Sequence, residues 1–551
     1  MNGRRKKLNL RFSITLWSIC ILMGTNVYSQ PQEKPKLVLM ISVDQMSPDY
    51  FERFSAIFHG GFRKLATEGM VYKNCSLEYA YTETGPGHAT MSTGCFPFKH
   101  GIFLNDWYDP RNYAKIYCVR DSLARPVEGL GGYASPRNLA VTTIGDWLKA
   151  SSPLSRVVSL SVKDRAAVLM GGQRPDVVSW YSKDEGKFVS SSYYDKRLPG
   201  FVKRFNEKNF LQWVPPVWER LNSECDPATG PDTMDGEQTR LGGSTAFPHP
   251  LPDSLKASLL QFTPYGDSIL LALAMDAVTD MRLGKSGQPD LLCIGLSCTD
   301  YIGHYFGPNS VEMCDHLKRL DESLGKFLES VEQFVGKENL VVVLTSDHSV
   351  QPLPEYSTRY LHKEMHRLID VEDIEPALKR ADSILRQTLH IDEPLINPHG
   401  FLGYRVADSA GLTVPGFENE VRKVLKDIKF VRDVFFRHEL VSAERDTRPH
   451  LAEFRRSYYA EQGPDFLIDF KDDYLTTEKD YPVNHDLFCM HVPLILWSQH
   501  IDHVEIHRKV MSVDIAPTLA RILGVPVPSW LDGKPLKEVV QKFDNNASSD
   551  K

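Results

Sequence analysis

The stretch Lys36-Leu-Val-Leu-Met-Ile-Ser-Val43 is a short, almost unbroken apolar run that leads directly into Asp44. Such a run is typical of a β-strand that is covered on both faces, as in the parallel sheet of an α/β protein. Similar runs recur at residues 157–162, 291–297, 340–345 and 492–497. Helical patterns lie between the runs, for example at residues 265–283 and 312–331. The alternation predicts an α/β fold with a central, mostly parallel sheet flanked by helices on both faces.

Polar residues of interest gather at the ends of these runs. In an open α/β sheet the ligand site lies beyond the carboxyl ends of the strands. The residues that closely follow a strand-like run are Asp44, Lys163, Arg165, Asp300, Asp347 and His348. His485 is different, because it precedes the run at 492–497. We expect these side chains to meet at one edge of the sheet.

Three long stretches, residues 105–137, 193–264 and 351–480, fit the strand–helix repeat poorly. The last of them contains helix-like segments of its own, over residues 358–370 and 376–389. We interpret the three as insertions into one core that overhang its site. The expected organisation is a core of residues 30–350 and 481–542, loops at 105–137 and 193–264, a cap at 351–480 and a disordered tail at 543–551.

The N-terminus has the pattern of an export signal. Basic residues from Arg4 to Arg11 precede an apolar run over residues 12–24, and small residues follow up to Ser29. This pattern predicts a signal peptide over residues 1–29. The run is short for a membrane span. We therefore expect export to the periplasm or beyond, without stable membrane insertion after cleavage; a short N-terminal anchor is the alternative.

Composition limits the class of protein and the partners that the chain can be expected to have. The chain has 551 residues, of which 42% are hydrophobic, and a net charge of −7. These values indicate a globular protein and give no reason to expect a nucleic-acid partner. The nine cysteines show no C-x-x-C spacing and are too sparse for a disulfide scaffold. Cys293 falls within a strand-like run, so we expect a buried thiol there.

Thr84 stands where a helix is expected to begin, in Thr84-Gly-Pro-Gly-His88. Pro86 suits the first helical position. A hydroxyl there lies near unpaired backbone N–H groups, which favour an ionised oxygen. A threonine hydroxyl is nevertheless a poor nucleophile unless a base or a metal activates it. Thr84 is therefore our candidate nucleophile, with Thr82 as its rival.

Aspartate and histidine residues of four separate segments have the types and spacing for two divalent cations. Asp300 and His304 are four positions apart, so they face the same way on a helix. Asp347 and His348 are neighbours at a strand end, where a turn can aim both at one point. Mixed oxygen and nitrogen donors suit zinc. The candidate ligands are Asp44, Asp300, His304, Asp347, His348 and His485.

These motifs together resemble the alkaline phosphatase superfamily, in order, from about residue 36 to residue 540. The matching segments are Val43-Asp44, Thr84 in Thr-x-Pro-x-His, Ser92-Thr-Gly94, His100-Gly-Ile102, Asp300-x-x-x-His304, Ser346-Asp347-His348, His485 and Asp514-Ile-Ala-Pro-Thr-Leu519 with Asp532-Gly533. The chain is most similar to the bacterial phosphate-irrepressible alkaline phosphatases. Those enzymes use a threonine nucleophile and are relatives of the nucleotide pyrophosphatase/phosphodiesterases.

The resemblance implies a role for each matching residue. One zinc would be held by Asp300, His304 and His485. The other would be held by Asp44, Asp347, His348 and the Thr84 hydroxyl. Thr84 would become a phosphothreonine that water then hydrolyses. Asn105 would contact a phosphoryl oxygen, and Lys163 and Arg165 would be the cationic pair of the monoesterases.

The expected function is that of an exported, zinc-dependent phosphomonoesterase that releases inorganic phosphate from a broad range of small-molecule monoesters. The nearest alternative is a phosphodiesterase or nucleotide pyrophosphatase of the same fold. A non-catalytic, metal-supported binding protein is the alternative from another class. The sequence does not determine the oligomeric state, for which we favour a monomer.

The chain departs from the family pattern at several points. His485 and His491 are only six positions apart, a shorter interval than the resemblance leads us to expect, so His491 is a rival ligand. Ser349 follows Asp347-His348 where glycine is usual. Cys95-Phe-Pro-Phe-Lys99 is similar to the sulfatase motif, but Lys99 replaces the required arginine and the segment falls after the nucleophile position. We therefore do not expect a sulfatase.

Overall fold

The computed structural model describes residues 34–128, 132–238, 243–477 and 489–544. The signal peptide expected at residues 1–29, His485 and most of the expected tail lie outside these residues. No helix among the described residues is long and apolar enough to cross a membrane.

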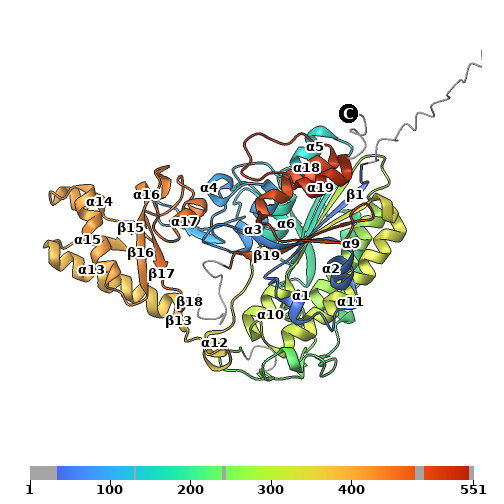
Figure 1. The fold of residues 1–551 in the computed structure, drawn as a ribbon, viewed down its shortest axis with the longest axis horizontal. Coiled ribbons are helices and arrows are strands. Elements are labelled where there is room, and N and C mark those ends of the chain that lie inside the picture. The colour runs from blue at the N-terminus through green and yellow to red at the C-terminus, as the bar shows by residue number, and fades with distance from the viewer. Residues whose placement is uncertain (1–33, 129–131, 239–242, 478–488, 545–551) are drawn as a thin grey trace, which may run out of the picture.

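The core is one large sheet with β1 in its middle (Figure 1). From one edge to the other, the strand order is β20 (Val504–Ile506), β2 (Met70–Ser76), β19 (His491–Ser498), β12 (Leu340–Thr345), β1 (Leu37–Val43), β11 (Asp290–Leu296), β6 (Val157–Ser161), β7 (Val177–Ser182), β8 (Lys187–Ser191) and β5 (Pro126–Val127), while β21 (Val510–Met511) also pairs with β2. The five strands from β12 to β7 run parallel to one another. Every residue of β1 is buried, as its almost unbroken apolar sequence predicts.

Helices cover both faces of the sheet, which confirms the predicted α/β fold. Alternate residues of β1 belong to two different cores: Leu39 and Ile41 pack on one side, Val38 and Met40 on the other. On the first side lie α2 (Gly61–Glu68), α9 (Tyr265–Asp280) and α11 (Val311–Val335). On the second lie α3 (Thr84–Thr93), α5 (Ile144–Ser151), α6 (Asp164–Gly171) and α18 (Ile515–Leu523).

Strand β19 corrects one prediction, because it runs antiparallel to both β12 and β2. Both faces of β19 are buried, so its sequence is as apolar as that of a parallel strand. The apolar pattern reports burial and does not indicate whether the strand runs parallel or antiparallel to its neighbours. The pairing of Thr345 with Leu494 places the start of β19 beside the end of β12. A residue that precedes β19 therefore approaches the same edge as residues that follow β1 and β12.

The region predicted as a cap has a hydrophobic core of its own, which includes Leu385, Phe417 and Phe436. Its main elements are β13 (His366–Ile369), α13 (Glu375–Leu389), β14 (Ile396–Asn397), β15 (Phe401–Leu402), α15 (Val414–Lys426), β16 (Val431–Phe436), β17 (Phe466–Phe470) and β18 (Tyr474–Thr477). In Figure 1 this region lies to the left of the sheet, where α17 (Leu451–Ser457) packs against α4 (Pro97–His100).

Of the two helices predicted within the cap, one is confirmed and the prediction of the other is wrong. The segment 376–389 is helical, as α13. The segment 358–370 instead contains the end of α12 (Pro354–Tyr360) and the strand β13. Between them His362 has a φ of 52°, a left-handed conformation that ends the helix. The stretches predicted as loops also hold short elements: β3 (Asp106–Tyr108) and β4 (Lys115–Tyr117) in the first, and α7 (Gly200–Glu207) in the second.

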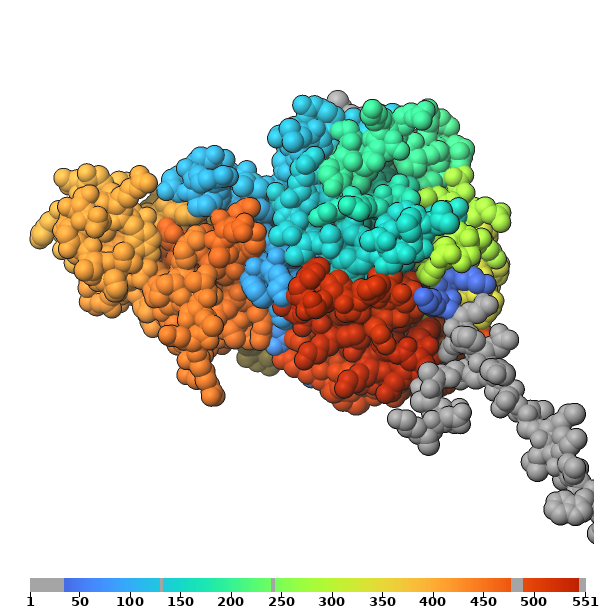
Figure 2. Space-filling model, turned by 90° about the horizontal axis from the view of Figure 1, so that it is seen from above, coloured from blue at the N-terminus to red at the C-terminus, as the bar shows by residue number. Residues whose placement is uncertain are grey.

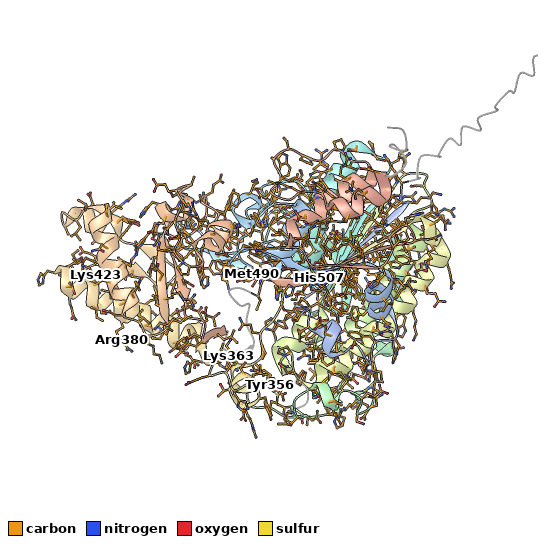
Figure 3. All side chains as sticks on the ribbon, viewed as in Figure 1. Tyr356, Lys363, Arg380, Lys423, Met490 and His507 are labelled. Atoms are coloured by element: carbon orange, nitrogen blue, oxygen red, sulfur yellow. A yellow bond between two sulfur atoms is a disulfide. The ribbon has the colours of Figure 1, made fainter. Side chains whose placement is uncertain are left out.

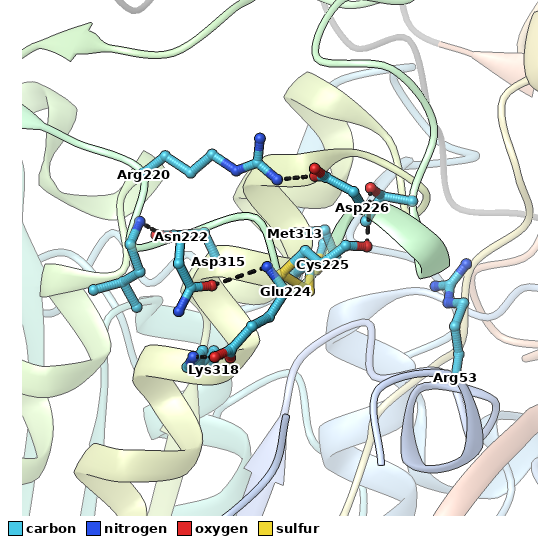
Figure 4. Close-up of a disulfide and its surroundings, with 12 residues drawn as sticks. Arg53, Arg220, Asn222, Glu224, Cys225, Asp226, Met313, Asp315 and Lys318 are labelled. Carbon is cyan, nitrogen blue, oxygen red and sulfur yellow. Dashed lines mark hydrogen bonds and ion pairs between the residues drawn. A yellow bond between two sulfur atoms is a disulfide. The ribbon is translucent and has the colours of Figure 1, made fainter. Parts of the chain in front are cut away.

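A disulfide joins Cys225 to Cys314, tying the long loop after α7 to α11 (Figure 4). The same loop is held by ion pairs from Glu224 to Lys318 and from Arg220 to Asp226. Cys293 is a buried free thiol, as predicted. The pairing could not be read from the sequence because the two cysteines are 89 positions apart and meet only in the tertiary structure.

Candidate active site

Thr84 is the first residue of α3, and its side chain is fully buried. The helix begins two residues earlier than the position of Pro86 predicts, so the proline is the third helical residue. Both Lys163 Nζ (3.3 Å) and Arg165 Nη2 (3.2 Å) donate hydrogen bonds to Thr84 Oγ1. Gly87 allows the close approach of α3 to β12, since a Cβ there would lie 2.2 Å from the carbonyl oxygen of Asp347.

Asp44, Asp347 and His348 form one cluster of candidate ligands, at the ends of β1 and β12. One ligand atom of each lies within 4.8 Å of the others, and all three side chains are buried. His348 Nε2 is 3.5 Å from Asp44 Oδ1 and 3.6 Å from Asp347 Oδ2. Its Nδ1 contacts the carbonyl oxygen of Ser349 at 2.9 Å. That contact orients the ring so that Nε2 faces the carboxylates.

Asp300 and His304 form the second cluster, on α10 (Cys298–Phe306). The helix places them on one face, as predicted, with His304 Nε2 3.1 Å from Asp300 Oδ1. His348 Nε2 lies 3.8 Å from the same Asp300 oxygen, so the two clusters adjoin. The structure thus brings together five predicted ligands from three segments of the chain.

The carboxylates are arranged as they would be around a cation. Burial, followed by the negative charge of Asp347, raises the pKa of Asp44 to about 7. Within the described part of the chain, Asp44 Oδ1 and Asp347 Oδ2 accept no hydrogen bond, while Asp44 Oδ2 has the ammonium of Lys163 2.7 Å away. Buried charged oxygens without such partners are costly unless a positive charge lies beside them. Carboxylate and imidazole donors in this arrangement fit a divalent cation.

Lys163 and Arg165 enter the site from the start of α6, directly after β6. Lys163 Nζ is 2.7 Å from Asp44 Oδ2 and also forms an ion pair with Asp300. Burial alone would lower the pKa of Lys163, but the charges of Asp300 and Asp44 hold it above its usual value. Arg165 Nη1 donates to the hydroxyl of Tyr117 at 3.4 Å. Both cations therefore stay charged and face Thr84.

Asn105 binds the backbone at the start of α3. Its Oδ1 accepts a hydrogen bond from the Gly85 N–H at 2.7 Å. Since the amide oxygen is engaged in this way, the NH₂ group is the part of Asn105 that can donate to a ligand above Thr84.

The rival residues lie elsewhere. The ring of His491 is exposed, and its Nε2 lies 3.0 Å from the carbonyl oxygen of Lys73 on the neighbouring strand. Cys95 follows the far end of α3 from Thr84, and burial raises its pKa to about 12, so it stays a neutral thiol. It is Thr84 Oγ1, and not Thr82, that accepts the hydrogen bonds from Lys163 and Arg165.

His88 and His100 are buried, neutral histidines. Burial lowers the pKa of His88 to about 4 and that of His100 to about 3. His88 Nδ1 contacts the carbonyl oxygen of Thr84 at 2.9 Å, and His100 Nε2 contacts Thr90 Oγ1 at 3.0 Å. Both histidines therefore stabilise α3 through contacts with its own residues.

Gln45 connects the two clusters and was missed by the sequence analysis. Its backbone N–H donates to Asp347 Oδ1 at 3.1 Å, and its side-chain Nε2 donates to Asp300 Oδ1 at 3.2 Å. The residue is buried and has a φ of 64°, a rare conformation for a residue other than glycine. The sequence feature that could have identified Gln45 as a site residue is its position directly after Asp44, at the end of β1.

The sheet, its two helical layers and the buried threonine beside Asp and His clusters form an α/β fold of the alkaline phosphatase type. The sequence model of the family "Type I phosphodiesterase / nucleotide pyrophosphatase" matches residues 38–491. The chain belongs to this family.

Two curated relatives and one crystal structure narrow the assignment. Alkaline phosphatase PafA from Elizabethkingia meningoseptica is 32% identical over 92% of this chain and 95% of its own length. Alkaline phosphatase PhoK from a Sphingomonas species is 32% identical over 93% of each chain. The crystal structure of wild-type PafA superimposes with a TM-score of 0.85 at 30% identity, covering 92% of this chain and 99% of that one. The chain is thus a hydrolase of the alkaline phosphatase group.

Replacing Gly303 by alanine tests the role of Gln45. A Cβ on Gly303 would lie 2.0 Å from Gln45 Oε1, so the amide must leave its bond to Asp300. Loss of a group that orients a metal ligand typically costs 10- to 100-fold, so we expect Gly303→Ala to lower the affinity for a divalent metal ion and phosphatase kcat/KM by about that factor. Metal content and p-nitrophenyl phosphate hydrolysis measure the two effects.

The controls use another helix and a double variant. Gly416→Ala places the same methyl group in α15, where Thr413 Oγ1 is the one atom nearby, and should leave both quantities unchanged. Adding Gln45→Ala to Gly303→Ala removes the clash, so the two losses should not add. Wild-type metal affinity in Gly303→Ala would show that Gln45 does not support the candidate ligands.

Proposed function

We propose that the chain is an exported, zinc-dependent alkaline phosphatase that releases inorganic phosphate from small-molecule monoesters through a phosphothreonine intermediate. One observation carries the proposal: Lys163 and Arg165 both donate to the hydroxyl of Thr84, which is buried at the start of a helix. Two fixed cations around one hydroxyl form a site for a doubly charged phosphoryl group.

The site residues divide into two sets of ligands. Asp44, Asp347, His348 and the Thr84 hydroxyl would hold one zinc. Asp300 and His304, with His485, would hold the other. Bound zinc lowers the pKa of a coordinated hydroxyl and neutralises charge on a phosphoryl or leaving oxygen.

Thr84 acts as the nucleophile in this mechanism. The Thr84 hydroxyl gives up its proton, and Oγ1 attacks phosphorus. The bond from phosphorus to the leaving oxygen breaks on the opposite side, the leaving oxygen takes up a proton to give the alcohol, and the phosphoryl group remains on Thr84. Water then hydrolyses the phosphothreonine and returns inorganic phosphate. The N-terminal end of α3 favours negative charge at this position throughout.

Three side chains would bind the phosphoryl oxygens. Asn105 donates from its NH₂ group, because its Oδ1 is held by Gly85. Arg165 can form paired hydrogen bonds through its planar guanidinium, and Lys163 adds a second positive charge. A monoester dianion carries one more negative charge than a diester, so this pair favours the monoester.

The disulfide supports the export part of the proposal. Disulfides form and persist in oxidising compartments such as the bacterial periplasm, and they are rare in the cytosol. The Cys225–Cys314 bond joins two buried positions of the core.

Removal of the metals tests the proposal as a whole. The purified protein should hydrolyse p-nitrophenyl phosphate, lose at least about 100-fold in rate after treatment with a chelator, and recover when Zn²⁺ is added. Full activity in the chelated protein would rule out a metal-dependent mechanism. Binding of zinc and phosphate without any turnover would favour the binding-protein alternative.

A further inference from the structure

A cavity of about 360 Å³ lies between the core segment around β3 and the cap. Its walls include Trp107 and Tyr108 from the core, and His399, Phe401 and Phe466 from the cap. In Figure 2 the light-blue segment after residue 100 packs against the orange part of the cap. We propose that this cavity binds the leaving group of the monoester and that it favours an aromatic alcohol. The inference rests on the proposed function.

The cavity adjoins the phosphate site through two short segments. Glu83, which precedes Thr84, and Asp106, which follows Asn105, both line it. The Asn105 N–H donates to Glu83 Oε2 at 2.5 Å, so the two segments are joined at the cavity wall. The cavity therefore begins one residue along the chain from both Thr84 and Asn105, next to the proposed site of the phosphoryl group.

The walls are preformed and flat. The rings of Tyr108 and His399 stack with centroids 3.7 Å apart and an interplanar angle of 15°. Trp107 Nε1 donates to Gln462 Oε1 at 2.6 Å. All four residues line the cavity, so these two contacts join the core to the cap at the cavity wall. Rigid aromatic walls of this kind favour an aromatic ligand, and the volume falls within the range of small-molecule sites.

The charge of the residues that line the cavity further restricts the class of leaving group that it can bind. Three carboxylate residues line the cavity: Glu83, Asp106 and Asp370. Negative charge at the wall disfavours a leaving group that carries its own carboxylate or phosphate. The structure therefore assigns the cavity to a neutral or cationic aromatic alcohol.

The test compares two phosphonates that the enzyme cannot hydrolyse. Phenylphosphonate and methylphosphonate share the phosphoryl dianion but differ in the group that would enter the cavity. Calorimetric titration of the zinc-loaded enzyme should show a preference for phenylphosphonate. Tyr108→Ala and His399→Ala should each reduce that preference by about 3- to 10-fold, the worth of one aromatic contact. Lys423→Ala, at the outer end of the cap (Figure 3), is the control and should not change it.

A second measurement needs no variant of the aromatic walls. Phenylphosphonate with a carboxylate in the para position should bind about 2- to 5-fold more weakly than phenylphosphonate itself, and Asp370→Asn should narrow that gap. An unchanged phenyl preference in both aromatic variants, with phosphatase activity intact, would overturn the cavity assignment alone. An enzyme that neither binds methylphosphonate nor hydrolyses any monoester would instead overturn the proposed function.

Discussion

Replacing Thr84 by alanine is expected to lower kcat for p-nitrophenyl phosphate by at least about 10⁴-fold. Removal of a nucleophile leaves only the residual catalysis of binding and charge stabilisation, which in hydrolases is smaller by this factor or more. The fold should be unaffected, because the start of α3 is held by backbone contacts such as the hydrogen bond from Gly85 to Asn105. Phosphate release, followed in the steady state, measures the loss.

Thr84→Ser is the matched control. Serine keeps the hydroxyl in place, so it should retain most of the activity that alanine loses. Rapid acid quenching during turnover, followed by peptide mass spectrometry, should locate one phosphoryl group on residue 84 of the wild-type enzyme. Wild-type turnover in Thr84→Ala, or a phosphoryl group on Thr82, would show that the nucleophile has been assigned wrongly.

The parts of the site that sequence reasoning found are those fixed by local rules. An apolar run followed by a carboxylate marked the ends of β1 and β12, and parallel strands bring such ends to one edge. A spacing of four placed Asp300 and His304 on one helical face. Both rules act within a few residues, so the chain reveals them without its tertiary structure.

What the sequence did not reveal depends on contacts between distant segments. The direction of β19 follows from how the chain re-enters the sheet after the cap, and its apolar pattern is the same in either direction. Gln45 gains its role from a left-handed backbone and from two carboxylates more than 250 positions away. The disulfide and the cavity between core and cap arise in the same way.

Replacing Arg165 by alanine is expected to change the preference of the enzyme between monoesters and diesters. Charge-assisted hydrogen bonds contribute about 1.5–3 kcal/mol each, so the loss of a paired contact should lower monoester kcat/KM by about 10²- to 10⁴-fold. A diester has one negative charge fewer, and its second ester group occupies the position that the guanidinium would bind. Its turnover should therefore fall by less than about 10-fold. p-Nitrophenyl phosphate and its methyl ester are the matched substrates.

Lys163→Ala should act in the same direction but with a second consequence. Lys163 also pairs with Asp44 and Asp300, so its loss leaves two buried carboxylates with less compensation and should alter zinc affinity. Arg165→Ala should not alter zinc affinity, so it tests the monoester preference alone. Arg165→Lys keeps the positive charge but loses the paired hydrogen-bond geometry of the guanidinium. Arg165→Lys should then recover only part of the monoester rate. An equal loss for monoester and diester in Arg165→Ala would mean that the cations bind any phosphoryl group, and the phosphodiesterase alternative would become the better description of this enzyme.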